Sequence, residues 1–523
     1  MLCCVVQTQF IVFNRSIKST MLFTLSVILV ALFIIYYWLK NKNSDYWKKR
    51  NVVYVEKKNP FGILWKFLTG NRSLAEVYKD IYDTYPGEPY VGVFIGSKPA
   101  LLIRDPENIQ AIFTSDFQSF HSRGIITNPN DVLADNILFM DDIRRWKLVR
   151  QKLSPIFTSS RLKNMFYIME HCAKDFAIFI KENEELQKQP FNLLYTYTTA
   201  SIGASVFGID TKTKNSMNSP FHDMAWKSVT PSFKANLRFF VGNTFPSLFK
   251  MLKLKIFGDH EDFFVHVVKD VLQMRQTETN KRHDFIDICL DLQKNGIMKD
   301  TTTNYELELT DELIAAQAFF FFIAGADTSA NTMHYTLLEL SNNSNVLNRV
   351  LKEIDDVFDS CDNKLTYDHI EKMTYLDKVL NEALRKYPPI GLIQRKCTKD
   401  TVLPTGLKVS KNMITITPVF AIHRDEKYYP NPELYNPERF SHENAENLIK
   451  YTYLPFGEGN RICIGARYAR LQVKAGLAWF LRCFTLEAQT LTPKTFEPSF
   501  FSLRATECNY KLIPRSHSNL LFK

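Results

Sequence analysis

The segment Phe456–Gly465, which reads FGEGNRICIG, contains the residues of this sequence best suited to chemistry. Its cysteine, Cys463, stands just before a helical run over residues 466–481. A helix N-terminus and nearby backbone N–H groups favour a thiolate over a thiol. Gly459 permits a tight turn, and Gly465 permits a flat ligand to approach the backbone closely. A thiolate held in a preformed apolar loop is a suitable proximal ligand for a haem iron.

A lone cysteine is usually a small buried hydrophobe, so the neighbours of Cys463 decide the interpretation. The pattern F-x-x-G-x-R-x-C-x-G arises by chance on the order of 10⁻⁴ times in a chain of 523 residues. Arg461 adds a fork of donors that matches a carboxylate. The loop is therefore a specific signal.

A second candidate is the segment Ala324–Ser329 (AGADTS), inside the apolar run Leu313–Leu340 that we predict to be helical. Thr328 can bond back to its own helix and loosen the backbone there. Asp327 places an ionisable group beside it, suitable for relaying protons. Such a pair is usually a surface or capping feature, but the preceding run Phe319–Phe322 favours burial.

The periodicity predicts the elements that must position these segments. Residues 106–360 are mostly helical in pattern, a helix follows from about Gly465, and residues 500–513 alternate like a hairpin. The predicted strands are Tyr90–Ile95, Ala100–Ile103 and short strands within Val402–Ile416. We expect one mainly α domain with a smaller β portion over residues 61–515, without an internal boundary.

Composition narrows the class of protein. Hydrophobic residues make up 45% and charged residues 23%, close to globular averages, which excludes a disordered or collagen-like chain. A mean hydropathy of -0.18 excludes a polytopic membrane protein. The nine scattered cysteines show no zinc-like spacing and favour a reducing compartment. The net charge of +10 is not gathered into Lys/Arg blocks, so we expect no nucleic-acid partner.

The run Met21–Trp38 has no charge, proline or glycine and is long enough to span a bilayer. We predict a single transmembrane anchor over residues 21–39, against the alternative of a buried core helix. The following flank is richer in Lys and Arg than the preceding one, which predicts a cytoplasmic location for the rest of the chain.

Three further segments lie outside the anchor and the domain. Residues 1–20 are an uncertain extension, either a mitochondrial presequence or an upstream start, and we favour the second. Residues 40–60 are polar and basic and look like a linker, and residues 516–523 form a tail.

The chain resembles the cytochrome P-450 family of haem-thiolate monooxygenases. The Cys463 loop matches the signature of the family, and the other motifs follow in the family's order over nearly the whole chain after residue 40. The stretches Tyr46–Arg50 and His423–Pro430 look most like the arthropod branch of the drug-metabolising clan. The resemblance implies the cytochrome P-450 fold around one buried haem b, with Cys463 as the axial ligand of the iron.

The resemblance also implies roles for further residues. Glu382 and Arg385 (EALR) and Arg439 (PERF) would form a buried structural triad that holds the cysteine loop, which is costly unless every donor is satisfied. The haem propionates need countercharges. The residues implied to bind the haem are Arg123, Trp146, Arg150, Arg395, Phe456, Arg461, Cys463 and Gly465. Asp327 and Thr328 would be the catalytic residues that activate oxygen.

Electrons must come from a partner, because no G-x-G-x-x-G follows a predicted strand. The resemblance implies an NADPH-dependent flavin reductase, with a small b-type cytochrome as an optional helper, at the endoplasmic reticulum membrane. A docking face for an acidic partner would consist of Arg144, Arg145, Lys147, Lys152, Arg467, Arg470 and Lys474, although a merely solvated face has equal weight.

Two further expectations concern the substrate and the membrane. The aromatic and basic stretch Pro220–Phe257 suits contact with lipid beside a substrate entrance, with a core helix as an equal alternative. The candidate walls for a small apolar substrate are Phe319–Phe322, Leu392–Ile393 and Phe500–Phe501.

The sequence departs from the family in one place, because the Pro-Pro-Gly-Pro hinge after the anchor is absent and only Asn59-Pro60 stands there. Two other functions stay open. One is a haem-thiolate isomerase or dehydratase that needs no O₂, and the other is a non-catalytic haem protein that senses a gas or redox ligand.

Overall fold

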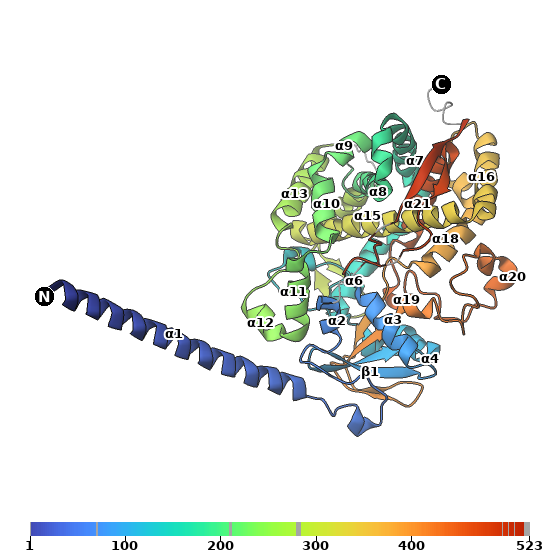
Figure 1. Cartoon of the computed structure of the whole chain (residues 1–523). Helices are drawn as coiled ribbons and strands as arrows, with labels where there is room; N and C mark the ends of the chain where they lie inside the picture. Colours follow the sequence, from blue (N-terminus) through green and yellow to red (C-terminus); the bar gives the residue numbers. More distant parts are fainter. Residues whose placement is uncertain are drawn as a thin grey trace.

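The computed structural model describes residues 2–69, 72–208, 212–278, 284–493, 495–499, 502–506 and 508–516. Helices form most of the described chain and short strands a smaller part, so the prediction of a mainly α fold with a smaller β portion is confirmed. Figure 1 shows the helices gathered in one large portion of the domain and the main sheet at its other end.

The helices follow one another along the chain with few long gaps. They are α1 (Leu2–Asn41), α2 (Leu64–Thr69), α3 (Leu74–Thr84), α4 (Pro106–Gln110), α5 (Phe117–Phe120), α6 (Ile143–Leu153), α7 (Ser159–Glu182), α8 (Pro190–Phe207), α9 (Thr213–Met217), α10 (Pro220–Val229), α11 (Phe233–Thr244), α12 (Pro246–Met251), α13 (Glu261–Thr277), α14 (Phe285–Lys294), α15 (Asp311–Asn342), α16 (Ser344–Asp359), α17 (Tyr367–Lys372), α18 (Thr374–Lys386), α19 (Val419–Ile422), α20 (His442–Ala445) and α21 (Ala466–Cys483).

Helix α15 is the centre of the helical portion (Figure 1). The side chain of Thr310 caps it by accepting a hydrogen bond from the amide of Leu313, and nearly all its later residues are buried. It packs most extensively against α8, with α7 and α21 in the same apolar core. The expected helix Leu313–Leu340 is confirmed, extended by one turn or less at each end.

Within the described residues, the strands form one four-stranded sheet and three two-stranded sheets. They are β1 (Tyr90–Ile95), β2 (Lys98–Ile103), β3 (Met298–Lys299), β4 (Glu306–Leu307), β5 (Ile393–Lys396), β6 (Thr401–Val402), β7 (Lys408–Val409), β8 (Ile414–Thr417), β9 (Phe484–Ala488) and β10 (Tyr510–Pro514). The order in the large sheet is β1-β2-β8-β5, in which only β2 and β8 are parallel.

The predicted strands of the large sheet are present, but the expected hairpin over residues 500–513 is wrong. Strand β10 pairs instead with β9, in a register that opposes Tyr510 and Ala488. Alternation within a segment cannot reveal a partner that stands more than 20 residues earlier, because pairing is decided by packing across the chain.

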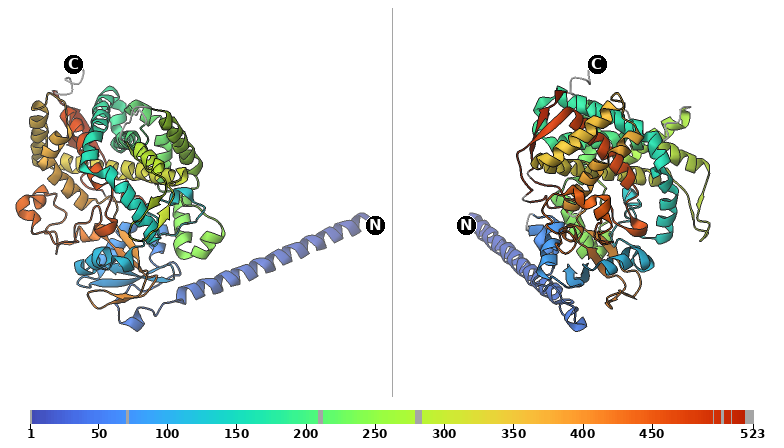
Figure 2. Two further views of the ribbon diagram at one scale, coloured as in Figure 1. Left: turned by 180° about the vertical axis from the view of Figure 1, so that it is seen from behind. Right: turned by 90° about the vertical axis from the view of Figure 1, so that its right-hand side faces the viewer.

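Helix α1 projects away from the domain in every view (Figure 1 and Figure 2). Its segment Phe23–Asn41 has a mean hydropathy of 2.0 and is not buried, so it is a candidate membrane anchor. Among the described residues, only α15 is also long and apolar enough to span a bilayer, and its apolar stretch is 78% buried in the domain core.

The end of α1 is fastened to the sheet by side chains. Lys57 donates from Nζ to the carbonyl oxygens of Leu39 (2.5 Å) and Lys42 (3.0 Å), and the hydroxyl of Ser97 also donates to Leu39 (2.8 Å). These bonds satisfy carbonyl groups that a helix end otherwise leaves without partners. Burial lowers the pKa of Lys57 to about 8, with Lys42 as a second cause.

Trp47 anchors the segment predicted as a linker. Its indole is 1% exposed, donates from Nε1 to the carbonyl of Val93 (3.1 Å), and leaves no room for a Cβ atom at Gly92, which would lie 2.7 Å from the ring. Val52 is buried in the same core. This segment has no proline-rich hinge, and it is held in place by the buried indole of Trp47 and by the hydrogen bonds of Lys57.

We expect Trp47→Ala to lower the free energy of unfolding by about 3–5 kcal/mol, because it empties a buried aromatic site and leaves the carbonyl of Val93 without its donor. Denaturant unfolding of the purified protein in detergent measures the change. Trp65→Ala is the matched control, since Trp65 is 44% exposed and should cost far less. An equal loss of unfolding free energy in both variants would show that Trp47 does not hold this segment.

Candidate active site

The segment around Cys463 is a tight loop that only glycine permits at one position. Gly459 has a φ of 72°, and a Cβ atom there would lie 2.0 Å from the carbonyl oxygen of Phe113. The amide of Cys463 donates to the carbonyl of Phe456 (2.9 Å) and closes the loop just before α21 begins at Ala466. The predicted position of Cys463 before a helix is confirmed.

The thiol of Cys463 borders a cavity of about 920 Å³. The side chain of Cys463 is solvent-accessible because it faces this cavity. Burial raises the pKa of the thiol, and the Gly465 amide, Arg150 and Arg123 oppose that rise. A metal ion would convert such a buried thiol to the thiolate.

The wall formed by α15 contains the second predicted motif. Thr328 donates from its hydroxyl to the carbonyl of Ala324 (2.7 Å), so the expected bond back to its own helix is confirmed. Ala324, Gly325, Asp327 and Thr328 line the same cavity as Cys463. Asp327 is 4% exposed, and its carboxylate accepts a hydrogen bond from Arg504.

Among the arginines that line this cavity, Arg123, Arg150, Arg395 and Arg461 form one cluster. Burial and mutual repulsion lower the pKa of Arg123 well below its ordinary value, and burial followed by repulsion from Arg395 lowers that of Arg461 to about 9. Burial also lowers the pKa of Arg395 to about 10. The cluster holds more positive charge than its surroundings balance.

The arginines bond mainly to backbone carbonyls. Arg150 donates to Ile462 (2.8 Å) and Arg123 to Leu138 (3.0 Å), while Arg461 stacks over Trp146 with 4.3 Å to the ring centroid. The Nε atoms of Arg395 and Arg461 are buried and have no hydrogen-bond partner among the described residues.

These observations test whether a haem fits. A haem needs a thiolate donor for its iron, an apolar space for its ring and cations for two propionates. Cys463 provides the first, the cavity of about 920 Å³ the second, and Arg395 and Arg461, with free donors, the third. The residues present fit the group.

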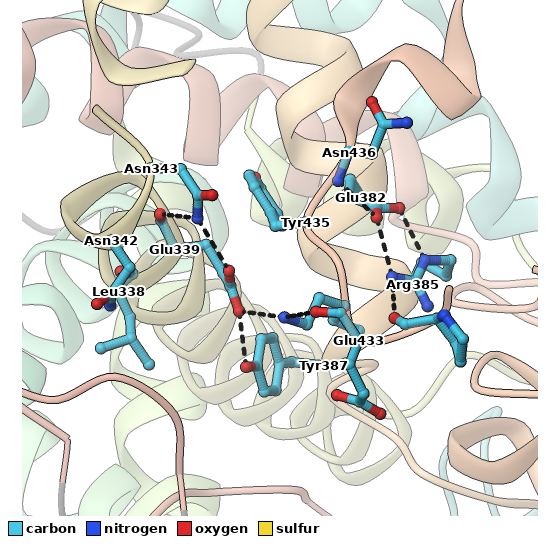
Figure 3. A network of polar contacts seen from close by, with 12 residues as sticks. Leu338, Glu339, Asn342, Asn343, Glu382, Arg385, Tyr387, Glu433, Tyr435 and Asn436 are labelled. Carbon is cyan, nitrogen blue, oxygen red and sulfur yellow. Dashed lines mark hydrogen bonds and ion pairs between the residues drawn. The ribbon is translucent and has the colours of Figure 1, made fainter. Parts of the chain in front are cut away.

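The expected triad is assembled at the end of α18. Glu382 accepts from Arg385 at 2.7 and 2.9 Å (Figure 3). It also accepts from Nε of Arg439 at 3.3 Å, and its side chain is fully buried. Arg385 also donates to the carbonyls of His423 (2.8 Å) and Pro432 (2.7 Å). The donors find partners, which is the condition for burying such a cluster.

A second cluster of buried polar side chains, which the sequence did not predict, lies beside the triad. Glu339 of α15 accepts from Nζ of Lys386 (2.8 Å) and from the hydroxyl of Tyr387 (2.7 Å), as Figure 3 shows for Glu339 and Tyr387. Tyr335 stacks on Tyr387 with 4.4 Å between ring centroids. This cluster ties α15 to α18 beside the triad. Glu339 lies three turns beyond Thr328, and nothing in its local pattern marks it.

Some predicted contacts are corrected. Lys474 is 2% exposed and paired with Asp377 (2.7 Å), so it is not part of a docking face. Of the four phenylalanines at 319–322, only Phe320 and Phe321 line the cavity, since Phe319 and Phe322 pack in the helical core. Leu392 and Ile393 line the cavity as expected, and Phe500–Phe501 lies outside the described residues.

A cavity that is lined by a cysteine loop, by the Asp327–Thr328 pair of a long helix and by a cluster of arginines defines a helical haem-thiolate protein. Comparison with known proteins names the family. The chain matches the cytochrome P-450 family model over residues 56–513 and belongs to this family.

Relatives cover most of the chain. It is 35% identical over 486 residues to cytochrome P-450 6B7 of Helicoverpa armigera, which spans 90% of this chain and 93% of that protein. It is 33% identical to a probable cytochrome P-450 6a21 of Drosophila melanogaster (84% and 88%). It is 32% identical to cytochrome P-450 6j1 of Blattella germanica (93% and 97%). The resemblance to the arthropod branch is confirmed.

Membership of the family establishes the class of reaction. The protein is a monooxygenase of the cytochrome P-450 family, which uses haem b ligated by cysteine and electrons supplied by a reductase.

We expect Glu382→Gln to lower the free energy of unfolding by about 3–5 kcal/mol, because it leaves Arg385 and Arg439 buried without their countercharge. Denaturant unfolding of the holoenzyme reports the loss. Asp356→Asn is the control, because it breaks the exposed pair with Lys352 and should cost about 0.5 kcal/mol or less. A Glu382 variant as stable as the control would show that the triad is not structural.

Proposed function

We propose that this protein is a membrane-anchored monooxygenase that inserts one atom of O₂ into a small apolar molecule. The observation that carries the proposal is one cavity that Cys463, Asp327 and Thr328 all line. Bound haem b would supply the oxidising chemistry, and the thiolate would favour cleavage of the O–O bond.

The chain's own residues would hold the cofactor in place. Cys463 would ligate the iron, with Phe456 and Gly465 bounding the loop on which it stands. Arg123, Arg150, Arg395 and Arg461 would neutralise the two propionates, with Trp146 supporting the guanidinium of Arg461. Glu382, Arg385 and Arg439 would keep the loop rigid without touching the reacting atoms.

The residues on α15 would manage protons and space. Thr328 bonds to its own helix, so its hydroxyl can turn toward the cavity at small cost in backbone bonding. Asp327 supplies an ionisable group one residue earlier. Much of the cavity wall is apolar, including Phe320, Phe321 and Leu392, which favours an apolar substrate, xenobiotic or lipid-like.

The electron donor would be an NADPH-dependent flavin reductase, with a b-type cytochrome as an optional helper. The remaining candidates for its docking face are Arg144, Arg145, Lys147, Lys152, Arg467 and Arg470. Arg145 pairs with Asp135, Arg144 with Asp142 (3.4 Å) and Lys147 with Asp300 (3.6 Å), so these pairs must reopen for an acidic partner. Arg467 is exposed beside the cysteine loop.

The site would lie at the cytoplasmic face of the endoplasmic reticulum membrane, held by the single anchor in α1. Exposed apolar side chains on α2, α11 and the end of α12 would dip into the same bilayer. They are Trp65, Leu68, Phe233, Leu237, Leu248, Met251 and Leu252. Phe61, which precedes α2, packs against Phe240 of α11 with 5.3 Å between ring centroids.

Two alternatives remain distinguishable. A haem-thiolate isomerase or dehydratase would need the thiolate and the cavity but neither O₂ nor a reductase. A haem sensor would need no room for a bulky substrate beside the haem. The Thr328 motif supports the monooxygenase over both.

We expect the reduced, carbon-monoxide-bound wild-type protein to show the red-shifted Soret band of a thiolate-ligated haem with an open sixth position. Cys463→His should retain haem but move the band to the position of histidine-ligated haems and abolish monooxygenation. Cys361→Ala, in a cysteine away from the cavity, is the control and should leave the band unchanged. A red-shifted band in Cys463→His would remove Cys463 from its assigned role.

We expect Thr328→Ala to consume NADPH at a similar rate but to convert it into product on the order of tenfold less efficiently, because proton delivery is disturbed. The ratio of product to NADPH consumed in a reductase-supported assay measures this coupling. Thr336→Ala is the control two turns later, because its hydroxyl also donates to its own helix (2.7 Å) but Thr336 is not part of the cavity lining. Unchanged coupling in Thr328→Ala would favour the isomerase.

A further inference from the structure

A lysine is buried at the end of the membrane anchor without an acid to balance its charge. Lys57 is 7% exposed, and among the described residues no carboxylate pairs with it. Its ammonium uses all three N–H groups, which donate to the carbonyls of Leu39 (2.5 Å) and Lys42 (3.0 Å) and to the hydroxyl of Ser97 (3.1 Å). A buried cation is costly unless negative charge surrounds it. The carbonyl groups at the C-terminal end of α1 supply partial negative charge here.

The turn between β1 and β2, which consists of Gly96 and Ser97, also holds this helix end. The hydroxyl of Ser97 donates to the carbonyl of Leu39 (2.8 Å), and the carbonyl of Ser97 accepts from the side chain of Asn43 (2.9 Å). Leu39 therefore receives two side-chain hydrogen bonds at a position where a helix end usually leaves its carbonyls to water. The anchor is thus fixed to the sheet by side chains as well as by the backbone.

The same turn contacts the end of α11. Lys98, directly after the turn, donates from Nζ to the carbonyl of Asn243 (3.1 Å). Gly96 has a φ of 60°, and a Cβ atom there would lie 3.1 Å from Cγ2 of Thr244, so the glycine permits this close approach. Asn243 lines the cavity, together with Phe239 of α11. The turn therefore connects the end of the anchor to a wall of the cavity.

The cavity reaches the surface near α11, because the exposed residues Ser232 and Lys234 belong to its lining. Figure 1 shows α11 and α12 on the side of the domain toward which α1 projects. The exposed apolar side chains of Phe233 and Leu237 lie on the same helix. The part of the cavity wall that the turn contacts is thus the part closest to the proposed bilayer.

We propose that Lys57 is a positioning residue for substrate uptake: with the β1–β2 turn it couples the membrane anchor to α11, so that the cavity entrance stays turned toward the bilayer. The inference rests on the proposed membrane anchoring. It assigns a purpose to a buried cation that the chemistry of the haem site does not use.

Hydrogen exchange of the full-length holoenzyme, in discs of phosphatidylcholine bilayer, tests the coupling without turnover. Lys57→Met should raise the exchange rate of backbone amides several-fold at the end of α1 and also at the end of α11, to which Lys57 donates no hydrogen bond. Ser97→Ala should have the same effect in weaker form, because Lys57 still holds Leu39. Lys58→Met is the matched control, since Lys58 is an exposed neighbour and should change neither helix.

Uptake of two ligands of the haem iron tests the consequence. n-Octylamine partitions into lipid, whereas imidazole reaches the cavity from water, and both shift the Soret band on binding. In Lys57→Met the association rate of n-octylamine should fall several-fold while that of imidazole stays unchanged, because only the entrance from the bilayer is displaced. A general loss of structure would change both rates alike. Lys58→Met should match the wild type with both ligands.

Each outcome decides a separate point. Faster exchange confined to the end of α1 in Lys57→Met would overturn the coupling to α11. Equal changes in the two association rates would overturn the role in substrate uptake. If Lys57→Met does not fold, Ser97→Ala carries both measurements. Release of the wild-type protein from membranes by alkaline carbonate would instead refute the proposed anchoring, and loss of its thiolate Soret band would refute the proposed monooxygenase.

Discussion

An excess of buried positive charge is the physical constraint on which the site depends. Arg123, Arg150, Arg395 and Arg461 come from four separate segments and meet beside one cavity. Burial lowers the pKa of each, and repulsion from neighbouring arginines lowers those of Arg123 and Arg461 further, so the protein without its cofactor holds these cations in an unfavourable place. A dianionic group that enters the cavity relieves this repulsion, and its binding free energy stabilises the fold by mass action.

The same constraint explains how the large sheet, the helices and the cysteine loop come to act together. Arg395 stands on β5 of the sheet, Arg150 on α6, and Arg461 in the loop of Cys463. A ligand that pairs with all three bridges the sheet to the helical core. Elsewhere, the triad of Glu382, Arg385 and Arg439 fixes α18 to the segment that contains Arg439, and the ion pair of Glu339 and Lys386 fixes α18 to α15. Buried charges are thus paired within the protein at the triad and at Glu339, whereas the arginine cluster at the cavity is left for the cofactor to neutralise.

The wall formed by α15 follows a different principle. There the hydrogen bonds are made within the chain, with Thr328 bonded to Ala324 and Ser329 to Gln472 (2.8 Å). A hydroxyl that donates to such a partner is not free to donate into the cavity until its side chain turns. The apolar side chains around the wall, such as Phe320 and Phe321, keep these hydrogen bonds away from bulk water.

The sequence by itself determined the helical class, the long apolar helix at the N-terminus, the cysteine loop and the motif at Asp327 and Thr328. Each is a local pattern whose meaning depends on neighbours within about ten residues, such as a glycine beside a cysteine or a run of apolar side chains. The resemblance to a family added Glu382, Arg385 and Arg439 in the right relation to one another. Only the tertiary structure decided that Arg504 holds Asp327, that Lys474 is buried and that β10 pairs with β9. These contacts join segments far apart in the chain, and their free energy comes from burial and charge pairing that no local pattern encodes.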